Sequence, residues 1–177
     1  GIGGSEEAVI NISRELAKLG NKVTVWNKCG DDEGDYNGVK YENYEYFEKP
    51  KDVVIYWRNP EYPVKFGRAK KKTVLWLHDA MPEYSILPVK YLVDDVFVLS
   101  TYHANLYPHL KDKTMITSNG INLEHFNQKV KRNPKKIVYG SSYDRGLKEL
   151  LEMWSEIKLA EPEAELTYFY GKGGLEK

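Results

Sequence analysis

Short apolar runs alternate with helical segments along most of this 177-residue chain. Most of the runs are unbroken, a pattern typical of strands in a parallel sheet that is covered on both faces. Strands are predicted at 23–26, 38–44, 53–57, 73–77, 96–99, 114–117, 136–139 and 165–170. Helices are predicted at 6–19, 64–69, 101–109 and 145–158, and the acidic segment 29–37 is expected to be an exposed loop. The sequence therefore predicts an α/β protein.

Residues 1–5 form a glycine-rich loop that leads directly into the first predicted helix. Glycine permits positive φ angles and close approach of a ligand, Ser5 can cap the helix, and the helix dipole favours an anion at this end. Gly3 and Gly4 are therefore candidate ligand-binding residues. The loop lacks the spacing G-x-G-x-x-G and follows no strand, so a glycine turn entering an ordinary surface helix is an equal alternative.

The charge balance and the cysteine content exclude several classes of protein. Lysine plus arginine and aspartate plus glutamate each number 26, so the net charge gives no argument for binding nucleic acid. The single cysteine, Cys29, excludes an internal disulfide framework and a zinc site built from cysteines. No apolar run has the length of a membrane span and no signal peptide is visible, so a soluble cytoplasmic protein is expected.

A polar, basic segment that ends at Pro134 predicts a boundary between two domains. We expect one domain at 1–128, a linker at 129–134 and a second domain at 135–177. The second part holds a single β-α-β unit, which is too small for an independent core. We therefore expect this domain to be truncated, and its apolar helical stripe to be covered by a swapped partner, an oligomer or residues outside this chain.

Several segments, taken together and in this order, resemble one family. They are Gly3-Gly4-Ser5-Glu6, Lys22-Val23-Thr24-Val25, Leu77-His78-Asp79, residues 98–103, residues 117–122 with Phe126, and residues 139–147 with Pro162. They look like the retaining glycosyltransferases of the GT-B fold, in particular the group 1, family 4-like enzymes that use nucleotide-sugar donors. The resemblance implies two Rossmann-like domains. Residues 1–128 would be most of the acceptor domain without its first strand, and residues 135–177 would begin the donor domain.

The resemblance also implies roles for particular residues around the donor. His78 matches the histidine beside the reacting sugar, where a neutral imidazole can bind a hydroxyl; a buried structural histidine is the alternative. Gly3 and Gly4 match the loop that approaches the donor diphosphate. In the second domain Ser141 and Arg145 would bind that diphosphate, although the usual pattern of two cations is reduced here to Arg145.

Three further residues are candidates for binding the acceptor. Arg58 ends a predicted strand and suits a phosphate, carboxylate or hydroxyl, but an ion-paired arginine is equally compatible. Asp79 can bind hydroxyls or cap the next segment, and Asn119 lies in a predicted turn that would flank the cleft. His103 and His109 are expected on a helix surface rather than among ligands.

The resemblance implies transfer of a sugar from a UDP-sugar or GDP-sugar donor to a saccharide, lipid or protein acceptor, with retention and without a cofactor or a metal. The chain alone is not expected to catalyse this transfer, because the paired glutamates that would contact the donor lie beyond the segments that match. Lys70, Lys71 and Lys72 suggest contact with a membrane surface, or else a solvated face.

Two alternative functions remain open. One is a sugar- or nucleotide-binding module without catalysis. The other is a Rossmann-type nicotinamide enzyme, which the missing glycine fingerprint and the absence of an acidic residue directly after the strand at 23–26 disfavour.

Overall fold

The computed structural model describes residues 3–48 and 52–169 of the chain. The chain divides into two compact units, Gly1–Ile121 and Asn122–Lys177. This division lies ahead of the linker that the sequence predicts at 129–134. Among the described helices, none combines the length and the apolar character that crossing a bilayer requires.

The first unit contains a four-stranded sheet in which every strand runs parallel to its neighbours, in the order β4-β5-β6-β7. The strands are β4 (Val53–Trp57), β5 (Lys72–Trp76), β6 (Asp95–Val98) and β7 (Thr114–Ile116). Their register places Trp57 beside Trp76, and Trp76 beside Phe97. The prediction of an α/β protein with a Rossmann-like parallel sheet is confirmed at this level.

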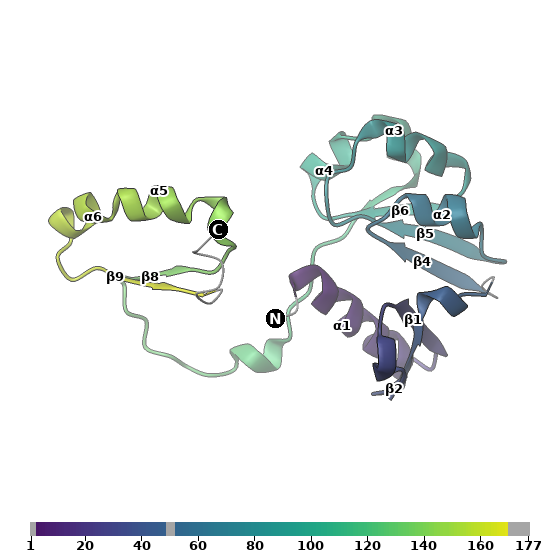
Figure 1. Cartoon of the computed structure of the whole chain (residues 1–177), viewed down its shortest axis with the longest axis horizontal. Helices are drawn as coiled ribbons and strands as arrows, with labels where there is room; N and C mark the ends of the chain where they lie inside the picture. Colours follow the sequence, from purple (N-terminus) through teal and green to yellow (C-terminus); the bar gives the residue numbers. More distant parts are fainter. Residues whose placement is uncertain (1–2, 49–51, 170–177) are drawn as a thin grey trace. The chain divides into compact units, whose positions relative to one another are not determined.

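The main hydrophobic core lies on one face of this sheet, where short helices cover it (Figure 1). These are α2 (Glu61–Phe66), α3 (Glu83–Ile86), the 3-10 helix η3 (Leu87–Tyr91), α4 (Thr101–Asn105) and the 3-10 helix η4 (Pro108–Lys113). The core comprises Val54, Tyr56, Leu75, Leu77, Ile86, Val89, Val93, Val96, Val98, Tyr107 and Leu110. The opposite face is covered only in part, because Val74 and Trp76 are buried there whereas Ile55 and Met115 are exposed.

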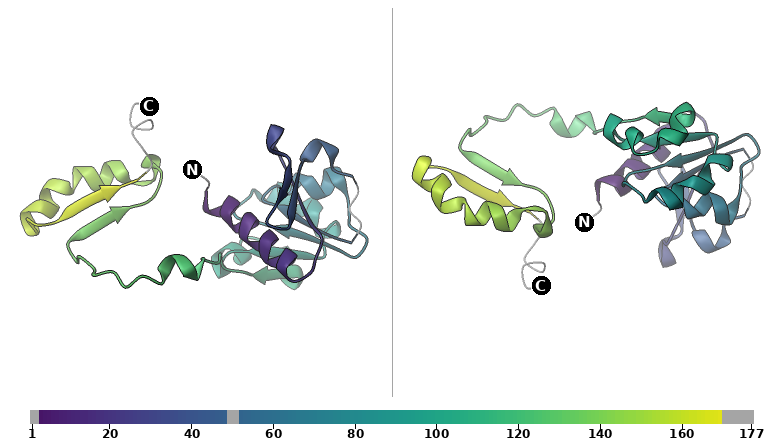
Figure 2. Two further views of the ribbon diagram at one scale, coloured as in Figure 1. Left: turned by 90° about the horizontal axis from the view of Figure 1, so that it is seen from below. Right: turned by 90° about the horizontal axis from the view of Figure 1, so that it is seen from above.

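A second sheet of the same unit has the order β1-β3-β2. Strands β1 (Val23–Asn27) and β3 (Val39–Asn43) are parallel, and β2 (Gly34–Tyr36) is antiparallel to β3. Helix α1 (Gly4–Lys18) packs against β1 and β3 (Figure 2). Short 3-10 helices, η1 (Gly30–Asp32) and η2 (Tyr44–Tyr46), lie in the connections.

Strand β2 corrects the prediction of a loop at 29–37. The chain reverses at Asn37 and Gly38, which have φ angles of 54° and 77°. Two successive residues with positive φ form the kind of tight turn that joins antiparallel strands, and Asn-Gly is the sequence that favours this turn most strongly. The acidic composition of the segment concealed this signal.

The helices also differ from their predicted bounds. Gly67, with a φ of 78°, ends α2, so the helix predicted at 64–69 lies earlier in the chain. The helix predicted at 101–109 divides into α4 and η4, because Pro108 cannot continue an α-helix. The segment 83–91, which forms α3 and η3, was not predicted to be helical.

The second unit contains a parallel pair of strands, β8 (Lys136–Tyr139) and β9 (Glu165–Tyr168). Helices α5 (Leu147–Glu152) and α6 (Trp154–Ala160) lie along one face of the pair (Figure 1). The single helix predicted at 145–158 is thus interrupted at Met153. The 3-10 helix η5 (Leu123–Phe126) precedes β8, and the 3-10 helix η6 (Tyr143–Arg145) lies between β8 and α5. Leu147 is buried, but Leu151 and Val138 are exposed, so the described residues of this unit leave part of its apolar surface uncovered.

Candidate functional site

The carboxyl edge of the four-stranded sheet gathers polar residues from several connections. Because β4 and β5 are parallel, the residues that follow them meet at one edge. Arg58 directly follows β4, and His78 and Asp79 follow β5. Arg58 adopts a φ of 64°, yet its backbone N–H donates to the carbonyl of Trp76 at 2.8 Å. The turn after β4 is therefore hydrogen-bonded to β5, and the Arg58 side chain reaches Asp79.

Ion pairs join this edge to the start of α1. The guanidinium of Arg58 contacts Oδ2 of Asp79 through Nε at 2.7 Å and through Nη2 at 2.5 Å. Its Nη1 lies 3.4 Å from Oε1 of Glu6, and its Cζ lies 5.3 Å from the centre of the Trp57 ring. One cation thus stands between two carboxylates. We predict that Arg58 anchors an anionic acceptor. Such an acceptor would have to compete with Asp79 and Glu6 for the guanidinium.

The glycine-rich loop reaches this cluster through Glu6. A Cβ added to Gly3 would lie 2.5 Å from Oε2 of Glu6, so the absence of a side chain leaves room for the carboxylate. Gly3 is the N-cap of α1, with an extended backbone at φ −75°. Ser5 does not cap the helix, as the sequence suggests it could; it lies inside α1 and its hydroxyl donates to Glu6. Neither Gly3 nor Gly4 uses a positive φ.

His78 lies among aromatic rings at the same edge. The centre of its ring is 4.6 Å from that of Trp76 and 6.1 Å from that of Trp57. Burial lowers the pKa of His78 below its ordinary value, and the charge of Arg58 lowers it further, whereas Asp79 and Glu6 raise it. The imidazole is therefore neutral at pH 7.

Several buried nitrogen atoms at this edge have no hydrogen-bond partner among the described residues. They are both ring nitrogens of His78, Nε1 of Trp57 and of Trp76, and Nε2 of His103. His103 is only 6% exposed, which corrects the prediction that it lies on a helix surface. Burial lowers the pKa of His103, while a backbone hydrogen bond and the charge of Asp79 raise it. The edge thus has hydrogen-bonding capacity that the described protein atoms leave unused.

The sequence therefore located three residues that the structure brings together, Arg58, His78 and Asp79, and it placed Gly3 and Gly4 beside them. It missed Glu6, the tryptophans and His103. Trp57 and Trp76 lie at the ends of predicted strands, and this position alone could have marked them as site residues. The contact between Glu6 and Arg58 joins residues 52 positions apart, so no local sequence pattern indicates it.

The remaining predicted site residues lie outside this cluster. Asn119 is exposed in an irregular segment after β7. In the second unit Ser141 follows β8, and Arg145 ends η6 rather than beginning a helix, because Gly146, with a φ of 102°, separates it from α5. The neighbouring Asp144 has a lowered pKa because the Ser142 side chain donates a hydrogen bond to it, with a smaller contribution from Arg145.

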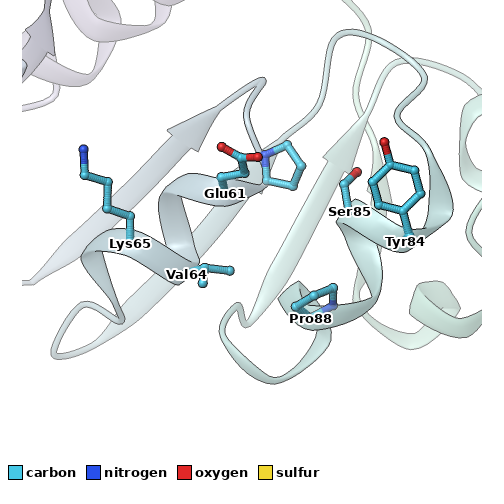
Figure 3. Close-up of a pocket in the computed structure, with 7 residues that line it drawn as sticks. Glu61, Val64, Lys65, Tyr84, Ser85 and Pro88 are labelled. Carbon is cyan, nitrogen blue, oxygen red and sulfur yellow. The ribbon is translucent and has the colours of Figure 1, made fainter.

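Two other surface features are separate from the cluster. An open depression of about 420 Å³ lies between α2 and the α3–η3 segment and is lined by Pro60, Glu61, Val64, Lys65, Tyr84, Ser85 and Pro88 (Figure 3). The basic cluster at 70–72 is largely neutralised. Lys71 lies 3.2 Å from Asp52, and Lys72 lies 2.5 Å from Asp95. Within the described ranges no group of three or more His, Cys, Asp or Glu side chains is arranged to hold a metal ion.

Comparison of the chain with protein-family models, with curated protein sequences and with solved structures finds no match.

Proposed function

We propose that the chain forms part of a retaining glycosyltransferase that moves a sugar from a UDP-sugar or GDP-sugar donor to a saccharide, lipid or protein acceptor. The observation that carries the proposal is the convergence of the first turn of α1, Arg58, His78 and Asp79 at the carboxyl edge of a parallel sheet. Ligands of open α/β sheets bind at this edge. Carboxylates, a guanidinium and a neutral imidazole are together suited to the hydroxyl groups of a sugar.

In this proposal His78 holds a sugar hydroxyl beside the reacting carbon, and Asp79 and Arg58 orient acceptor hydroxyls. Gly3 and Gly4 offer backbone N–H groups to the ligand at this edge, where such groups can stabilise negative charge. Ser141 and Arg145 of the second unit bind the donor diphosphate. The protein therefore acts chiefly by positioning groups and by stabilising charge.

Nucleotide binding tests the donor assignment. NMR spectra of the 15N-labelled chain are recorded during titration with UDP, with GDP and, separately, with NAD. UDP or GDP should shift the amides of residues 140–146, and Arg145→Ala should remove the effect. Lys148→Ala is the matched control, because Lys148 is an exposed cation three residues further along the chain. Shifts by NAD alone would favour the nicotinamide enzyme, and no shift by any nucleotide would contradict the donor site.

One observation favours a second candidate, a sugar-binding module without catalysis. The carboxylate of Glu6 lies beside Gly3, in the space that a Cβ of residue 3 would occupy. Its negative charge there opposes the approach of a diphosphate. Titration with neutral monosaccharides distinguishes the two functions. A non-catalytic module should show shifts around His78 and Asp79 with sugars, and no response to UDP or GDP in either unit.

A further inference from the structure

The connection that carries His78 and Asp79 is an irregular segment, residues 77–82, between β5 and α3. The backbone N–H of its first residue still donates to a carbonyl of β6, at 2.9 Å. Further along, the carboxylate of Asp79 pairs with Arg58, but both side chains are roughly half exposed. Ion pairs of this kind contribute little to stability. The pair with Arg58 therefore does not by itself fix the position of Asp79.

Helix α4 supplies two side chains that bind the backbone of this connection. His103 and Tyr107 are four residues apart, a spacing that places side chains on one side of a helix, and their ring centres are 5.8 Å apart. The Tyr107 hydroxyl bonds to both backbone groups of Met81. The His103 ring donates a hydrogen bond to the backbone of Asp79. One short helix thus holds the connection at two points, and one of these points is a residue of the candidate site.

The ring of His103 has its own position fixed and depends on this hydrogen bond. Its backbone N–H donates to Oγ of Ser100, the N-cap of α4, at 3.1 Å, and the residue is only 6% exposed. Burial lowers the pKa of His103, so the ring is neutral at pH 7 and has a single N–H to donate. Water is excluded as an alternative partner, and a buried donor without a partner is costly. An apolar side chain would fill the same space without this cost.

We propose that His103 is a positioning residue of the candidate site, which holds the backbone of Asp79 where its carboxylate meets the guanidinium of Arg58. The contact between Oδ2 of Asp79 and Nε of Arg58 is 2.7 Å long, so a small displacement of the Asp79 backbone would break it. His103 itself touches no ligand in this role. The inference concerns how the cluster is held together and is independent of the proposed function.

The Nε proton of Arg58 reports directly on this contact, because it is the proton donated to Asp79. Its exchange with solvent is measured by NMR of the 15N-labelled chain. His103→Leu should accelerate this exchange about tenfold. His103→Asn and His103→Gln each keep a side-chain N–H donor, at the levels of the two ring nitrogens, and at least one of them should restore slow exchange.

His109→Leu is the matched control. His109 is a second partly buried histidine beside Tyr107, with ring centres 6.4 Å apart, but it lies 3.6 Å from Glu83 rather than at Asp79. It should leave the exchange of the Arg58 proton unchanged. Equal acceleration by both leucine variants would overturn the proposal, and so would failure of both amide variants to restore slow exchange.

Urea denaturation of the same variants separates positioning from simple packing. Both roles lower the stability of His103→Leu, but only positioning changes the exchange of the Arg58 proton. A destabilised His103→Leu with unchanged exchange would therefore show that His103 only fills space, and would overturn the proposal. If His103→Leu does not fold, His103→Phe takes its place as the variant that fills the space without a donor.

Discussion

At the scale of single residues, Arg58 combines an unfavourable backbone conformation with two ion pairs. Its φ of 64° lies in the left-handed region, which costs an L-residue about 1–2 kcal/mol. The pairs with Asp79 and Glu6 involve side chains that are roughly half exposed, and such pairs contribute little to stability. The conformation is therefore retained at a net cost to folding, a combination that is common at functional sites.

Substitution of Arg58 measures this strain. Arg58→Gly and Arg58→Ala both remove the guanidinium, but only glycine accepts a positive φ without strain. Arg58→Gly should therefore unfold with a free energy about 1 kcal/mol higher than Arg58→Ala, as measured by urea denaturation. Equal stabilities of the two variants would show that the backbone at this position is not strained.

His78 should titrate below the ordinary histidine pKa of about 6.5. Burial and Arg58 both disfavour its charged form, so the unfolded chain binds this proton more tightly than the folded chain. Stability should fall as the pH drops below 6.5. Arg58→Gln should raise the pKa of His78 in an NMR titration of its ring protons. Arg68→Gln, which removes a guanidinium paired with Asp94, should leave it unchanged, and an equal response to both variants would contradict the assignment.

At the scale of elements, the connection after β5 is held by Tyr107. Its hydroxyl donates to the carbonyl of Met81 at 2.9 Å and accepts from the N–H of Met81 at 2.6 Å. The tyrosine is 2% exposed, so both backbone groups depend on it rather than on water. This contact fixes the segment that begins with His78 and Asp79 against the helices of the core.

Removing the hydroxyl should loosen this connection. Tyr107→Phe leaves a buried N–H and a buried carbonyl unpaired and should lower the free energy of unfolding by about 1–3 kcal/mol. Tyr102→Phe is the matched control, because Tyr102 lies close by on α4 and is 74% exposed. Thermal denaturation followed by circular dichroism compares the two. If both variants melted at the temperature of the unmodified chain, the hydroxyl would have no structural role.

The strands could be predicted from the sequence far better than the helices or the site contacts. Strands β4 to β7 consist mainly of β-branched and aromatic residues, and their composition marks them without knowledge of their neighbours. Helices α2 to α4 have four to six residues each, too few for a helical period to emerge. The Glu6–Arg58–Asp79 contacts depend on how α1 meets a distant sheet edge, which no local pattern encodes.

At the scale of the whole molecule, the chain consists of two units with unequal cores. The first buries a continuous cluster on one face of its sheet. In the second, the buried hydrophobic residues are Leu147 and Ala164, while Val138, Phe169 and Leu159 are exposed among the described residues. The second unit should therefore be the less stable one, since buried apolar area is the main source of stability.

Chemical denaturation should separate the two units. Trp154 is the tryptophan of the second unit, so replacing Trp26, Trp57 and Trp76 with phenylalanine leaves a fluorescent reporter there. Its signal should change at a lower urea concentration than the far-ultraviolet circular dichroism of the unmodified chain. Replacing Trp154 alone should remove the early fluorescence change. A single transition at one midpoint by both methods would show that the units unfold together.

The order β4-β5-β6-β7 is also the order in which these strands occur in the sequence. Each strand after β4 therefore pairs with the strand synthesised immediately before it, and closing each contact requires only the intervening connection. During translation this sheet can grow by one strand at a time in a single direction, without waiting for distant sequence. Parallel sheets usually fold slowly. In this sheet, however, the strand order lets a nascent chain add each strand to the growing sheet as that strand leaves the ribosome.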